Sequence, residues 1–62
     1  MTKLYLLSSD DENRYFTDLK LAKDQALGFY ITKSNQLVEL SEIDPLTHKH
    51  IKTIETNFNH VE

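Results

Sequence analysis

The chain has 62 residues, a formal net charge of −3 and no cysteine. A chain of this length buries only about 60% of its unfolded surface. We therefore expect one small domain, residues 1–62, with a thin core and no disulfide or thiolate-bound metal to reinforce it. The net charge argues against general nucleic-acid binding, which depends on neutralising phosphates with Lys and Arg. The opening "MTKLYLLSSDDENR" has an apolar run too short for a signal peptide or a membrane span, so we expect a cytoplasmic protein with no membrane partner.

The first elements have the composition of a β-hairpin. Residues 3–9, "KLYLLSS", are mostly apolar and end in serine, as a strand before a turn does. The polar segment "DDEN" follows, and it contains residue types that favour tight turns. Aromatic residues resume in "RYFT", residues 14–17, which we expect to form the second strand.

Residues 17–32 change to the period of a helix. Leu19, Ala22, Ala26 and Phe29 recur at the spacing of one helical face. Thr17 or Asp18 can cap the start of this helix by accepting a backbone N–H bond. Gly28 costs about 1 kcal/mol relative to alanine inside a helix, and it can instead end the helix, in which case a strand begins at Phe29. We expect the helix to continue to about Thr32, because the apolar face continues past Gly28.

A short alternating segment, residues 37–43, is expected to be a strand, and the segment after it is ambiguous. In "IDPLTHKHIKTIE" Asp44 can cap a helix and Pro45 suits its first position. Apolar residues then recur at helical spacing: Ile51, Ile54, Phe58 and Val61. One open alternative is therefore a C-terminal helix.

A hairpin is the other alternative for this segment, and we favour it. Asp44-Pro45 presets a type I turn, and the β-branched residues that follow prefer a pleated backbone. The sequence resembles the Asp-Pro-x-Thr-Gly-Lys turn between strands of propeller blades, with His48 in place of the glycine. The resemblance covers one hairpin and implies no propeller.

Together these elements predict an α+β fold in the order β-β-α-β-β. We expect a small antiparallel sheet with one helix packed on one face and a loose tail from about residue 57; the alternative is β-β-α-β-α with a C-terminal helix. The expected inner side chains are Leu4, Leu6, Phe16, Leu19, Ala22, Ala26, Phe29, Val38, Leu40, Ile51 and Ile54.

One helix shields only one face of such a sheet, so the other face is the main candidate for binding. Tyrosine suits interfaces, because it buries a large area and keeps a polar tip. The expected partner-binding residues on this face are Tyr5, Leu7, Tyr15, Leu37 and Ile43. Scattered apolar residues on an ordinary surface are the simpler explanation.

Acidic residues suggest a second surface. Asp10, Asp11 and Glu12 form an acidic turn, and Glu39 and Glu42 can extend it. Carboxylates in such an arrangement can mimic phosphates and occupy the basic cleft of a nucleic-acid-processing enzyme. A solvated turn is the simpler interpretation, and no glycine follows at the position that a calcium loop needs.

Neither a metal site nor a catalytic site has a clear signature. His48 and His50 would share one face of a strand, and His60 could be a third ligand, but the spacing is not typical of zinc sites. One glycine, no cysteine and no convincing acid pair leave no phosphate loop or activated nucleophile. We therefore expect no cofactor, no metal and no enzymatic activity.

The leading functional hypothesis is a non-catalytic protein-interaction domain, a small regulator or inhibitor. In length and acidity the chain is similar to accessory proteins of phages and mobile elements, which implies a host protein as the partner. Self-association as a homodimer is included in this hypothesis. The alternative is a small nucleic-acid-binding module that uses Lys20, Lys23 and Lys33 with the tyrosines.

Overall fold

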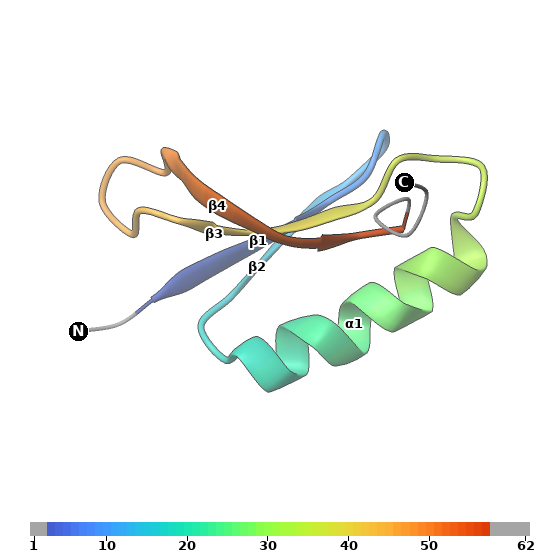
Figure 1. Ribbon diagram of the computed structural model, residues 1–62, viewed down its shortest axis with the longest axis horizontal. Coiled ribbons are helices and arrows are strands. Elements are labelled where there is room, and N and C mark those ends of the chain that lie inside the picture. Colours follow the sequence, from blue (N-terminus) through green and yellow to red (C-terminus); the bar gives the residue numbers. More distant parts are fainter. Residues whose placement is uncertain (1–2, 58–62) are drawn as a thin grey trace.

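The computed structural model describes residues 3–57. It contains β1 (Leu4–Ser8), β2 (Asn13–Phe16), α1 (Leu19–Thr32), β3 (Glu39–Ile43) and β4 (His50–Thr56). The strands form one antiparallel sheet in the order β2-β1-β3-β4, and α1 lies across one face of it (Figure 1). The expected β-β-α-β-β fold is confirmed, and residues 44–56 form a turn and a strand in place of the alternative helix. The predicted tail beyond residue 57 lies outside the described residues.

The helix α1 follows its predicted boundaries. The side chain of Asp18 caps it by accepting a hydrogen bond from the backbone N–H of Lys20, 2.9 Å away. Ala22, Ala26 and Phe29 are buried, as the apolar face predicts. Gly28 is exposed, and a Cβ atom there would meet no atom within 4 Å beyond its chain neighbours and the backbone of its own helix. The helix passes through this glycine to Thr32, so the shorter helix is wrong.

The core lies between α1 and the sheet. Ala22 and Ala26 are both fully buried, and their small side chains let the helix approach the strands closely. The buried cluster consists of Tyr5, Leu7, Ala22, Ala26, Phe29, Val38 and Leu40, with Phe16, Leu19, Tyr30 and Ile54 packed against it.

The predicted faces of β1 are the reverse of the observed ones. Tyr5 and Leu7, expected on the outer face, are 8% and 0% exposed, and they face α1. The register explains this, because Leu7 lies opposite Leu40 and Tyr5 opposite Phe16. Leu4 and Leu6 therefore point to the other face. The run "LYLL" is apolar at every position, so alternation within it could not identify the buried side.

Ile51 is the other error in the predicted core. The register of β4 against β3 shifts between Glu42 and Ile43, whose partners are Lys52 and His50. Ile51 is therefore the unpaired residue of a β-bulge, and it is 53% exposed. Ile54 falls at the second register shift but still packs against the core.

The turn between β3 and β4 has the backbone that the propeller-type resemblance implies. His48 adopts φ 62°, the left-handed conformation that glycine would have at this position. Its N–H donates to the carbonyl of Asp44 (2.8 Å), and the N–H of Asp44 donates to the carbonyl of Lys49 (2.9 Å). These two bonds close the loop into a hairpin.

Candidate functional site: the open face of the sheet

The face of the sheet opposite α1, called here the open face, divides into an apolar part and a polar part. Strand register places alternate residues of each strand on it. The apolar part contains Leu4, Leu6, Tyr15 and Ile43, and the polar part contains Glu39, Ser41, His50 and Thr53.

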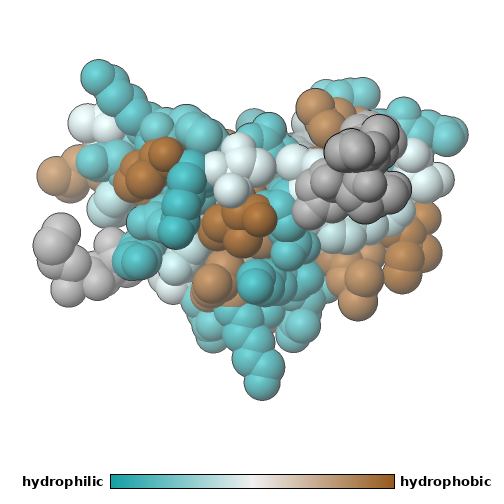
Figure 2. Space-filling view, in the orientation of Figure 1, coloured by the Kyte–Doolittle hydropathy of each residue, from teal (hydrophilic) through white to brown (hydrophobic). Residues whose placement is uncertain are grey.

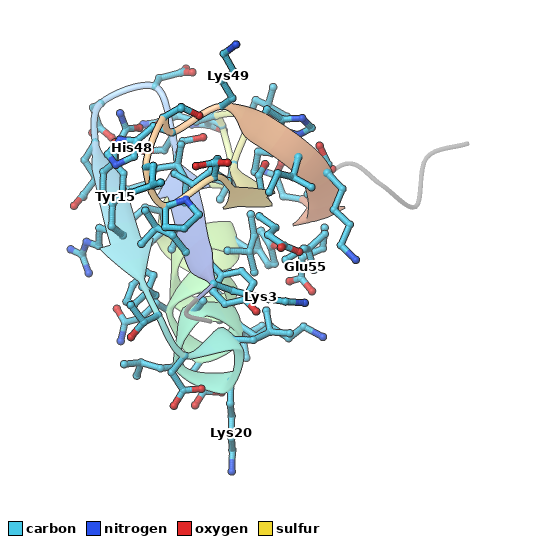
Figure 3. All side chains as sticks on the ribbon, turned by 90° about the vertical axis from the view of Figure 1, so that its left-hand side faces the viewer. Lys3, Tyr15, Lys20, His48, Lys49 and Glu55 are labelled. Carbon is cyan, nitrogen blue, oxygen red and sulfur yellow. The ribbon has the colours of Figure 1, made fainter. Side chains whose placement is uncertain are left out.

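The β3–β4 turn folds back over the apolar part. The ring of His48 lies 5.3 Å from the ring of Tyr15 on β2, and Figure 3 shows the two side by side. Because β1 lies between β2 and β3, the turn must cross β1 on the open face to make this contact. Ile43, at the end of β3 where the turn begins, is only 2% exposed. One end of the open face is therefore covered by the chain itself.

The polar part is a hydrogen-bonded network centred on Glu39. Its Oε2 accepts from the hydroxyl of Thr53 (2.7 Å) and from that of Ser41 (3.0 Å). The Nε2 atom of His50 lies 3.0 Å from the Thr53 hydroxyl and 3.8 Å from the Glu39 carboxylate. The hydroxyl of Ser41 contacts the carboxylate, and His50 contacts Thr53, so this is no serine–histidine relay. The network satisfies polar groups of adjacent strands.

Basic side chains from other elements form ion pairs with the predicted acidic turn. Lys33, at the end of α1, places its Nζ 3.0 Å from Asp11 and 3.5 Å from Glu12. Arg14 lies 2.8 Å from Glu12 and donates to the side chain of Gln25 on α1 (3.1 Å). We call Asp11, Glu12, Arg14 and Lys33 the tip clamp, because they join the β1–β2 hairpin to α1.

The tip clamp also changes the ionisation of its members. A hydrogen bond from Lys33 lowers the pKa of Asp11, and one from Arg14 lowers the pKa of Glu12. The bond to Asp11 raises the pKa of Lys33 in return. Both cations also lie over the ring of Phe29, at 5.0 Å for Arg14 and 5.2 Å for Lys33. These charges are therefore paired within the molecule.

The five acidic residues predicted to form one surface are found in separate places. Asp11 and Glu12 belong to the tip clamp, and Asp10 is beside them. Glu39 lies in the network of the open face, whereas Glu42, opposite Tyr5, faces the helix side of the sheet. The structure does not bring these carboxylates together.

The predicted partner-binding residues are also divided. Tyr15 and Leu37 are 49% and 51% exposed and accessible to another molecule. Tyr5 and Leu7 are in the core, and Ile43 is on the open face but buried. The prediction of accessible side chains is therefore wrong for these three, since register and the folded-back turn enclose them.

The histidines are directed to different partners. His48 contacts Tyr15, whereas His50 lies near Thr53 and Glu39. Within residues 3–57 no three potential ligands among His, Cys, Asp and Glu come together. His60, the third predicted ligand, lies outside the described residues.

The basic and aromatic residues of the nucleic-acid hypothesis do not share a surface. Lys33 is paired in the tip clamp, and Tyr5 is buried. The hydroxyl of Tyr30 donates to Glu55 on β4 (2.7 Å), and burial together with this bond raises the pKa of Tyr30. Lys20 points away from α1, far from Tyr15 in the view of Figure 3.

Two exposed apolar features were not predicted. Leu46, in the β3–β4 turn, is 91% exposed, and its place after Asp-Pro in a solvent-facing turn is the signal that could have identified it. On α1, Leu27 and Ile31 are 59% and 72% exposed, one turn apart. Figure 2 shows apolar side chains at the end of the molecule where α1 finishes.

Comparison of the chain with protein-family models, with curated proteins and with solved structures finds no match. Within the described residues, α1 has 14 residues, and no helix is long and apolar enough to cross a bilayer.

Proposed function

We propose that the protein is a non-catalytic protein-interaction domain, a small regulator or inhibitor that binds another protein through its open face. The observation that carries this proposal is Tyr15, which is half exposed on the face without a helix and is held in place by His48. Aromatic side chains with few accessible rotamers bind at low entropic cost. Leu6, beside Tyr15 in the register, adds apolar surface.

The total exposed surface is that of an ordinary folded monomer. The chain exposes 4338 Å², and the scaling for folded monomers gives about 4,200 Å² at 7.3 kDa. Nothing in this total requires a permanent subunit. The proposal rests on which side chains are exposed, and a second copy of the chain is one form of the partner.

Phosphate mimicry gains no support as the mode of binding. Asp11 and Glu12 are paired with Lys33 and Arg14, and Glu39 bonds to Thr53. The apolar part of the open face is the better basis for recognising a partner. This holds also if the partner is a nucleic-acid-processing enzyme. On size and acidity alone, we propose that the chain is a phage-type accessory protein. Its setting would then be cytoplasmic and its partner a host protein.

Nucleic-acid binding is the weaker candidate. It needs a continuous basic surface with stacking aromatics, and Lys20 and Lys23 on α1 are separated from Tyr15 on the open face. A labelled oligonucleotide at low salt separates the two functions. Binding that weakens steeply with salt would favour nucleic acid.

The test of the proposal is affinity capture with a matched pair of variants. Tyr15→Ser removes the exposed ring from the open face, and Ile31→Ser makes a similar change on the outer side of α1. We expect the wild type and Ile31→Ser to capture the same protein, or to self-associate in sedimentation, and Tyr15→Ser to lose this by about tenfold or more. Equal capture by both variants, with both folded, would contradict the proposal.

A further inference from the structure

Five hydrogen bonds hold the backbone of the β3–β4 turn. Oδ1 of Asp44 accepts hydrogen bonds from the N–H groups of Leu46 (2.7 Å) and Thr47 (3.0 Å). The hydroxyl of Thr47 accepts from the N–H of Lys49 (3.3 Å). With the two backbone bonds that close the loop, the backbone from Asp44 to Lys49 is fixed before any partner arrives.

His48 fixes the orientation of this turn on the sheet. Glycine would adopt the left-handed backbone at this position without steric cost, so histidine is the less favourable residue for the turn alone. What histidine adds is the ring contact with Tyr15, at 5.3 Å. The contact ties the turn to β2 across β1, so turn and open face form one continuous surface.

Leu46 projects from this fixed turn. It is 91% exposed, the most exposed of the large apolar side chains in the described residues. Figure 2 shows apolar atoms protruding at the end of the molecule occupied by the β3–β4 turn. Because its backbone is already ordered, Leu46 would lose little conformational freedom on entering a pocket.

The charge around Leu46 differs from that of the whole chain. Lys49, in the turn, is exposed, belongs to no ion pair among residues 3–57 and points away from the molecule in Figure 3. Lys52 is also exposed, but it lies on β4 opposite Glu42, on the helix side of the sheet. The nearest acid in the turn, Asp44, has its carboxylate directed at backbone N–H groups. The turn therefore presents the ammonium group of Lys49, unpaired among residues 3–57, on a molecule whose net charge is −3.

We propose that Leu46 is the anchor of the interface, inserting into an apolar pocket of a protein partner whose rim carries a carboxylate that meets Lys49. This inference rests on the proposed function and names the partner's chemistry. A lipid surface is less suited, because a single leucine gives weak insertion and the net negative charge opposes anionic headgroups.

The test begins with photocrosslinking of the full chain in its native cell. A photoreactive side chain is placed at position 46, at position 15 or, as the control, at position 31. The inference predicts an adduct with one protein from positions 46 and 15, and none from position 31. Equal labelling from positions 46 and 31, or lipid adducts alone from position 46, would overturn it.

The crosslinked protein is then purified and its Kd measured with folded variants. Leu46→Ser should weaken binding by about tenfold or more, and Lys49→Glu should weaken it and change its salt dependence, whereas Ile31→Ser should not. Adducts from position 15 with full affinity of Leu46→Ser would overturn the anchor and leave the proposed function standing. No adduct from either position 15 or position 46 would overturn both.

Discussion

His48 is the residue at which sequence and backbone disagree most. Its left-handed φ of 62° is typical of glycine, and an L-residue there costs roughly 1–2 kcal/mol. Part of this cost is offset by the ring contact with Tyr15, since aromatic pairs contribute about 0.5–1.5 kcal/mol. The two terms are of similar size, so replacing His48 can change stability in either direction, depending on the new residue.

Two substitutions separate these terms. His48→Ala removes the ring and keeps the strained backbone, whereas His48→Gly removes both the ring and the strain. We expect His48→Gly to be more stable than His48→Ala by about 1 kcal/mol. Urea unfolding of the two variants measures the difference. Equal stabilities would mean that position 48 is not left-handed in solution.

At the scale of elements, the helix was predictable and the strand faces were not. At 3.6 residues per turn, the spacing of Leu19, Ala22 and Ala26 places all three on one face of a helix, and α1 has this face. In β1 every residue from Leu4 to Leu7 is apolar, so the buried side depends on pairing with other strands. Pairing is non-local, and no property of the run itself determines it.

The bulges of β4 could not be predicted from the sequence either. Ile51 and Ile54 have the same side chain and are both apolar, yet Ile51 is exposed and Ile54 packs against the core. The difference arises from where the extra residues are inserted relative to β3.

The candidate site was predicted only in part. An open face was expected, but of the five residues predicted to bind a partner there, only Tyr15 and Leu37 are exposed.

Gly28 provides the test of the helix. It lies inside α1, and a methyl group there would meet no atom within 4 Å beyond its chain neighbours and the backbone of its own helix. Gly28→Ala should therefore stabilise the protein by about 1 kcal/mol, because alanine has the higher helix propensity. Thermal or urea unfolding measures this. Destabilisation would indicate that the helix ends at this residue.

At the scale of the whole molecule, the two faces of the sheet are covered unequally. The helix α1 spans one face, whereas among residues 3–57 only the β3–β4 turn lies over the other face, at one end (Figure 1). Because the sequence predicts one helix for one sheet, it also predicts that one face of the sheet has no helix. That the turn would fold back across β1 was not predictable, because it depends on a contact between His48 and Tyr15, 33 residues apart in the sequence.

The open face and the β3–β4 turn together form the proposed binding surface. Its most direct test is NMR of the isotopically labelled chain in extract of its native cell, where the amide signals of residues that meet a partner broaden. We predict broadening at Leu6, Tyr15 and Leu46 and sharp signals at Leu27 and Ile31 on α1. Broadening confined to α1, or uniformly sharp signals at every residue, would contradict binding through the open face and the β3–β4 turn.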